Sequence, residues 1–151
     1  MPRSTRLRLS TLGGAAPLVA LVLLGAGLLL VAPASASADT CVANGTTLCL
    51  NASRFKVTVA WQVPSQGTSG AGNGITLTTD TGEFWFFSAN NIELVVKVVD
   101  GRAFNDKFWV FYGALSNVQY TITVTDSTTG AVKTYQNPDG NLASVADVSA
   151  F

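Results

Sequence analysis

The chain has no histidine, and its only glutamates are Glu83 and Glu93. Histidine is the usual general base and the commonest protein ligand for metals, so its absence removes most catalytic and metal-binding arrangements. Two glutamates can serve as the paired carboxylates of a glycoside hydrolase. However, Glu83 follows a turn glycine and Glu93 is expected to face outward from a strand, so we predict that both are solvated. We therefore expect no enzymatic activity, with a hydrolase as the remaining catalytic alternative.

Cysteine is nearly absent, because the chain has only Cys41 and Cys49. Two cysteines close together in an exported protein are typical of a disulfide, whereas a redox site usually has the tighter CxxC spacing. In the chain-entropy model, closing so short a loop contributes roughly 2–3 kcal/mol. We predict a Cys41–Cys49 disulfide, which leaves no thiol for zinc binding or nucleophilic catalysis.

Charge is missing from a long stretch near the beginning of the chain. After three arginines no charged residue appears until Asp39, and within this gap Leu18–Val31 is apolar apart from two glycines. The gap ends in the small-residue sequence Ala36-Ser37-Ala38. A basic start, a short apolar core and a small-residue exit are the three parts of a secretory signal peptide. We expect residues 1–38 to be removed and a single domain, 39–151, to be secreted or held at the cell surface.

Two other interpretations of this first segment stay open. The uncharged stretch Leu12–Ala34 is nearly long enough to cross a bilayer, as an uncleaved anchor would. A lipoprotein would instead be acylated on Cys41, although the preceding Asp39 is a poor match to a lipobox. That alternative also leaves Cys49 without a partner.

Basic residues are few beyond residue 38, where six stand against nine acidic residues, a net charge of −3. Nucleic acids and anionic membranes attract proteins that carry a basic stripe, and none is present here. We expect no nucleic-acid partner, and no membrane contact after cleavage of the signal peptide.

The rest of the chain alternates apolar and polar residues with the period of two that β-strands have. In Phe55–Trp61 and Tyr120–Val124, large apolar residues alternate with polar ones, and Ile92–Val99 is a further strand with one fully apolar face. Such segments recur at short intervals with turn residues between them, which predicts an all-β, antiparallel immunoglobulin-like sandwich of about seven strands. The glycine-rich segment Gln66–Gly74 is predicted to be a flexible loop, and the tail Leu142–Phe151 to add an edge strand.

Two segments carry aromatic side chains on consecutive residues. Phe84–Phe87 and Phe108–Tyr112 must direct large rings to both faces of a sheet. A sandwich buries one face of each sheet, so some of these rings are expected outside, and adjacent strands would place them on one outer surface. Such a surface binds sugars or proteins; the alternative is that the loop or the tail covers it. The candidate ligand-binding residues are Trp85, Phe87, Trp109 and Phe111.

Oxygen-bearing side chains gather in two turns. Asp100 and Asp106 flank the sequence DGRAFND, and Asp139 lies in NPDGN, residues 137–141. Calcium takes such oxygen ligands in extracellular modules. However, Asp-Gly and Pro-Asp-Gly are ordinary turn sequences, and neither segment has the ligand density of a dedicated calcium loop. We expect no cofactor, with calcium at these three aspartates as the alternative.

Six segments together form a distinctive set that spans nearly all of residues 39–151. They are TLCLN (Thr47–Asn51), RFKVTVAW (Arg54–Trp61), GEFWFF (Gly82–Phe87), NIELVVKVVDG (Asn91–Gly101), FWVFYGALSNVQYTITVTD (Phe108–Asp126) and NPDG (Asn137–Gly140). The set resembles an uncharacterised all-β module of bacterial secreted proteins, often found at the C-terminal end of larger polypeptides. The resemblance implies an exported β-module without an established activity. We expect a binding or interaction module for an extracellular glycan or protein; the alternative is a structural domain of a homo-oligomer or cell-surface assembly.

Overall fold

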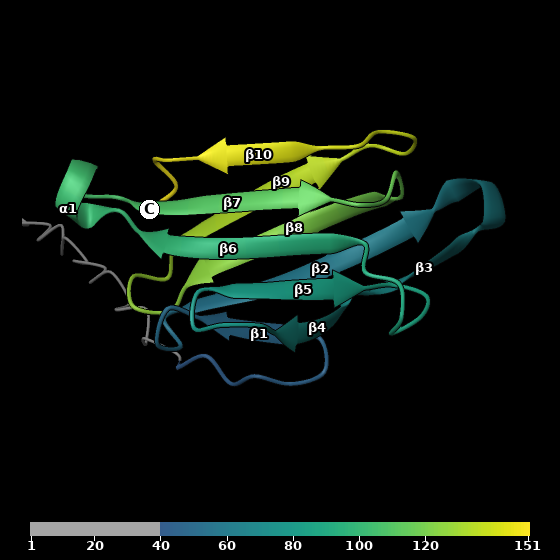
Figure 1. Cartoon of the computed structure of the whole chain (residues 1–151). Helices are drawn as coiled ribbons and strands as arrows, with labels where there is room; N and C mark the ends of the chain where they lie inside the picture. The colour runs from purple at the N-terminus through teal and green to yellow at the C-terminus, as the bar shows by residue number, and fades with distance from the viewer. Residues whose placement is uncertain (1–39) are drawn as a thin grey trace, which may run out of the picture. The chain divides into compact units, whose positions relative to one another are not determined.

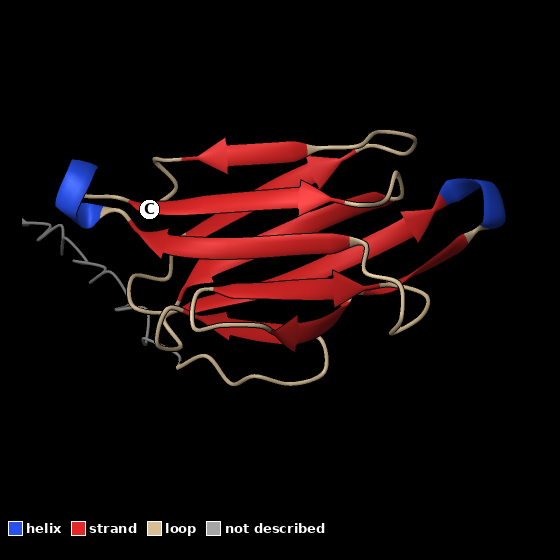
Figure 2. Cartoon of the chain, viewed as in Figure 1, coloured by secondary structure: helices blue, strands red, loops and turns tan. Residues whose placement is uncertain are grey.

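The computed structural model describes residues 40–151, which fold into two antiparallel β-sheets (Figure 1). The ten strands are β1 (Thr47–Leu50), β2 (Phe55–Val63), β3 (Thr68–Ala71), β4 (Asn73–Thr76), β5 (Thr81–Trp85), β6 (Leu94–Asp100), β7 (Phe108–Ala114), β8 (Gln119–Asp126), β9 (Val132–Asn137) and β10 (Ser144–Asp147). Figure 2 shows two short helical segments in this part of the chain, the 3-10 turn η1 (Pro64–Gln66) and the single-turn helix α1 (Arg102–Asn105). The all-β sandwich is confirmed, with ten strands rather than about seven. The predicted signal peptide lies outside the described residues.

Each sheet contains five strands. In the first sheet the order is β1-β2-β8-β9, and β3 pairs with the later half of β2. In the second sheet the order is β10-β7-β6-β5-β4. The prediction that the tail adds an edge strand is confirmed, because β10 pairs with β7 at one edge of the second sheet.

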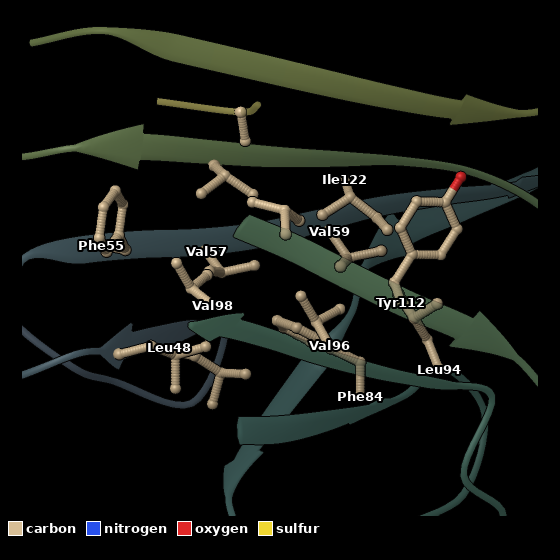
Figure 3. Close-up of a cluster of buried hydrophobic side chains, with 14 of the residues drawn as sticks. Leu48, Phe55, Val57, Val59, Phe84, Leu94, Val96, Val98, Tyr112 and Ile122 are labelled. Carbon is tan, nitrogen blue, oxygen red and sulfur yellow. The ribbon is translucent and has the colours of Figure 1, made fainter. Parts of the chain in front are cut away.

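The core lies between the two sheets and is made of the inward-facing residues of each strand (Figure 3). Alternate residues of β2, β6 and β8 are buried, as the period-two pattern predicts. Burying one such aliphatic side chain contributes about 1.5–3 kcal/mol. The buried aliphatic residues of these strands are Val57, Val59, Leu94, Val96, Val98, Ile122 and Val124.

The prediction of a flexible loop over Gln66–Gly74 is wrong. This segment contains β3, which belongs to the first sheet, and the start of β4, which belongs to the second, so the chain crosses between sheets at Gly72. A Cβ atom at Gly72 would lie 3.1 Å from Val59 and 3.2 Å from Phe84. The glycine therefore lets the crossing strand approach core side chains closely.

The predicted disulfide is confirmed. Cys41 is bonded to Cys49, with a Cα–Cα distance of 5.7 Å, and ties the segment before β1 to β1 itself. The lipoprotein alternative requires a free thiol at Cys41, which this bond consumes. Disulfides are typical of proteins that fold in oxidising, extracytoplasmic compartments. Among residues 40–151, no helix has the length and apolar character needed to span a bilayer.

Candidate functional site

The predicted binding residues lie in two places rather than one. Trp109 and Phe111 alternate with buried residues of β7 and face outward from the second sheet. Trp85 is the last residue of β5, and β6 separates β5 from β7 (Figure 1). Trp109 pairs with Val99, near the C-terminal end of β6. Trp85 follows Phe84, which pairs with Leu94 at the N-terminal end of β6. The strands are not neighbours, so the four predicted residues do not form a single surface.

One group forms an exposed aromatic patch, made of Phe104, Trp109 and Phe111. The side chain of Phe104 is 81% exposed, and its ring centroid lies 5.6 Å from that of Trp109. The Trp109 and Phe111 rings are 6.3 Å apart. The amine of Lys97 lies 5.0 Å from the centroid of the Phe111 ring, within the range of a cation–π contact. The patch therefore combines three rings with one positive charge.

Phe104 was missed by the sequence analysis because it belongs to α1, a single helical turn. The sequence DGRAFND was interpreted there as a turn with aspartate side chains. Figure 1 shows that α1 projects beyond the ends of β6 and β7. The Phe104 ring contacts Trp109 and is otherwise exposed. The only sequence signal for an exposed ring at Phe104 was an apolar residue close to an Asp-Gly turn.

Two hydrogen bonds and one glycine fix the position of the Trp109 ring. Its Nε1 donates to Asn105 Oδ1 at 2.8 Å, and Asn105 Nδ2 donates to the carbonyl oxygen of Val148 at 2.8 Å. A Cβ atom on Gly101 would overlap the indole, so the ring lies directly against the backbone there. The aromatic patch therefore rests on a fixed base that links α1, β7 and the segment after β10.

The candidate calcium ligands are not brought together. Asp100 forms an ion pair with Arg102 across 2.6 Å, and this hydrogen-bonded guanidinium lowers the pKa of Asp100 to about 2. Asp106 ends α1 with a left-handed backbone, and Asp139 lies in the turn after β9. Within residues 40–151, no group of three or more His, Cys, Asp or Glu side chains is placed to hold a metal ion.

A second aromatic cluster consists of Trp61, Phe86 and Phe87. The Trp61 and Phe87 rings are 4.9 Å apart, and Trp61 stacks on Phe86 at 5.9 Å. Trp61 Nε1 donates to the carbonyl oxygen of Ala71 at 3.2 Å. Phe87 is 52% exposed, but Phe86 belongs to the core. Most of this cluster thus closes the end of the sandwich, and Phe87 is its exposed edge.

The structure contradicts the predicted solvent exposure of one of the two glutamates. Glu93 was expected to be solvated, but it is only 1% exposed, so that expectation is wrong. Its carboxylate accepts hydrogen bonds from the backbone N–H of Phe86, at 2.6 Å, and from the side-chain amide of Asn91. These bonds hold the turn between β5 and β6. Glu83 is half-buried on the outer face of β5, opposite Val95.

Comparison with protein-family models, curated protein sequences and solved structures found no match to this chain. The functional argument therefore depends on the geometry of residues 40–151. Within them, the aromatic patch is the feature that folding itself explains least, because Phe104 contributes little buried surface. It is the candidate functional site.

Proposed function

We propose that the domain is an extracytoplasmic, non-catalytic interaction module that inserts Phe104 into an apolar pocket of another extracellular protein. The observation that carries this proposal is the high exposure of Phe104 next to a Trp109 ring whose position is fixed. A phenyl ring that is 81% exposed gains little from folding, yet it lies on a Trp109 ring that is itself held by Asn105. Rigid, protruding aromatic anchors of this kind dominate the binding free energy of many protein interfaces.

The arrangement of the rings favours a protein partner over an extended sugar chain. A sugar chain stacks best on rings that share a plane. The Phe104 and Trp109 rings are inclined by 39°, and the Trp109 and Phe111 rings by 77°. The patch is thus a ridge with Phe104 at its top rather than a flat platform. A ridge fits a pocket, and the Lys97 amine beside it suits an acidic group on the rim of that pocket.

Site-specific crosslinking tests the proposal. A photoreactive phenylalanine analogue would replace Phe104 in the full chain, and Phe87 in a matched control, because both positions are exposed rings at opposite ends of the domain. Each protein would be exported by its native host and irradiated on intact cells. We expect a crosslinked protein of distinct sequence at position 104 and none at position 87.

Other crosslinking results would contradict the proposed docking role of Phe104. A crosslink from position 104 to a second copy of the chain would support the homo-oligomer instead. Equal crosslinking from both positions, or none from position 104, would overturn the proposed docking role of the patch.

A further inference from the structure

The outer face of the first sheet is polar and almost uncharged. Its outward-facing residues are Thr47, Cys49, Lys56, Thr58, Ala60, Gln62, Ser69, Ala71, Gln119, Thr121, Thr123, Thr125, Val132, Thr134 and Gln136. Lys56 is the only charged residue among them. Threonine is common on solvated strands, so the threonines need no further explanation. The three glutamines are different, because all of them gather at one end of this face.

Strand register brings these glutamines together. Gln62 of β2 lies directly opposite Gln119 of β8. Two residues further along β8, Thr121 lies opposite Gln136 of β9. Neighbouring strands are about 4.8 Å apart, and successive residues on one face are about 6.8 Å apart. We call Gln62, Gln119, Thr121 and Gln136 the glutamine cluster; from Gln62 to Gln136 it extends over roughly 12 Å.

The surface is hollowed at the glutamine cluster. One open recess of about 430 Å³ is lined by Gln119, Thr121 and Gln136, together with Pro138 from the following turn. A smaller recess of about 100 Å³ adjoins it. Its lining includes Gln62 and Trp61, and it shares Gln119 and Thr121 with the larger recess. The two recesses share lining residues, and we refer to them together as the groove.

The side chains of the cluster are free to bind a ligand. Within residues 40–151, the three side-chain amides and the Thr121 hydroxyl form no hydrogen bond with another protein group. Each amide offers two donors and an acceptor, and the hydroxyl offers both functions. Sugar hydroxyls also donate and accept, so they match this set, whereas a charged ligand finds no counter-ion in the groove. The Trp61 ring is not part of this set, because it faces the core side of the sheet and stacks on Phe86.

We propose that the glutamine cluster binds a neutral sugar unit of an extracellular glycan. The amides of Gln119 and Gln136 and the hydroxyl of Thr121 bond the sugar hydroxyls. This site lies on the first sheet, whereas the aromatic patch lies on the second, so the two proposals stand or fall separately.

Side-chain amide NMR tests this proposal directly. The full chain would be titrated with neutral hexasaccharides of glucose, N-acetylglucosamine, mannose and xylose, each to about 10 mM, which detects millimolar affinity. An oligogalacturonate of the same length serves as the acidic probe. We expect one neutral oligosaccharide to shift the side-chain NH₂ signals of Gln119 and Gln136, while those of Asn90, an exposed amide outside the groove, stay fixed.

Matched variants give the decisive comparison. Gln119→Ala and Gln136→Ala should each weaken binding about tenfold, because each removes hydrogen bonds to the ligand. Thr134→Ala, on the same face but outside the recesses, and Phe104→Ala should bind as the unchanged protein does. Thermal melts of all variants would exclude unfolding as the cause. No shift with any neutral probe, tighter binding of the oligogalacturonate, or unchanged affinity in both glutamine variants would overturn the proposal.

Discussion

The guanidinium of Arg54 holds both carboxylate oxygens of Asp126, 72 residues away in the sequence. Nε donates to Oδ1 at 2.9 Å, and Nη2 donates to Oδ2 at 2.7 Å. The Arg54 guanidinium also lies 4.2 Å from the ring centroid of Phe108. The pair therefore fastens the start of β2 to the end of β8, and contacts the first residue of β7 in the opposite sheet.

This ion pair predicts how stability depends on pH. Burial opposes ionisation of Asp126, but hydrogen bonds from Arg54, Thr128 and Thr129 more than offset it, so the pKa of Asp126 is lower than usual. A depressed pKa in the folded state stabilises the protein above the unfolded pKa of about 3.9, and this contribution is lost as pH falls through the folded value. We expect the free energy of unfolding, measured in urea, to decrease below about pH 4.

Removing the Asp126 charge should reproduce this loss at neutral pH. We expect Asp126→Asn to lower the free energy of unfolding by about 3 kcal/mol, because Arg54 is left partly buried without its partner. The matched control is Asp100→Asn, which breaks the solvent-exposed ion pair with Arg102 and should leave the melting temperature almost unchanged. Equal effects of the two substitutions would contradict this assignment.

The buried Glu93 gives a second matched pair. In Glu93→Gln, one amide N–H group replaces an oxygen that accepts a hydrogen bond from Phe86 or Asn91. We expect a loss of about 2 kcal/mol in a chemical denaturation experiment, since a buried donor is left unsatisfied. Glu83→Gln, on the outer face, should be neutral within about 0.5 kcal/mol. A neutral Glu93→Gln would show that the turn between β5 and β6 is held by other contacts.

The disulfide contribution can be measured by double substitution. Replacing both Cys41 and Cys49 by serine should lower the free energy of unfolding by about 2–3 kcal/mol through the entropy of the unfolded chain. Addition of reductant should destabilise the unchanged protein by a similar amount and leave the double variant unaffected. A larger loss in the variant than in the reduced protein would indicate that serine disturbs the packing of Cys41.

The parts of the fold that were predictable from sequence are those set by local alternation. In β2 and β8, large apolar residues occupy every second position over most of each strand, and one face of a sandwich sheet must be buried, so the inward faces of both strands follow directly. The disulfide was predictable for a similar reason, because Cys41 and Cys49 are close in the chain. In each case the information lies within one short segment.

The errors concern residues whose environment is created by distant segments. Gly72 was interpreted as part of a flexible loop, but its role is to leave space for Val59 and Phe84. Glu93 was assigned to the solvated face of a strand, but the backbone of Phe86 folds onto it. The separation of the predicted aromatic residues depends on sheet order, which periodicity does not determine. The glutamine cluster was missed for the same reason, because strand register brings its residues side by side and the sequence pattern does not determine that register.

The proposed anchor predicts that stability and binding respond differently to the same chemical change. Phe104→Ala removes a ring that is 81% exposed, so we expect the free energy of unfolding to stay within about 0.5 kcal/mol of the original value. Phe108→Ala removes a ring that is 3% exposed, and should cost about 3–5 kcal/mol. Gly101→Ala should displace Trp109 and shift its fluorescence, while Gly45→Ala, which has open space around it, should not.

The crosslink from position 104 to the partner should also be measured in the Gly101→Ala and Gly45→Ala variants. If the ridge inserts into a pocket, a reactive group at position 104 should lose its crosslink in Gly101→Ala, because the Trp109 base beneath it has moved, and retain it in Gly45→Ala. A crosslink that persists in Gly101→Ala would mean that exposure of Phe104 alone is sufficient. Since rigid anchors bind more tightly than mobile ones, that result would remove the physical reason for assigning function to the fixed ridge.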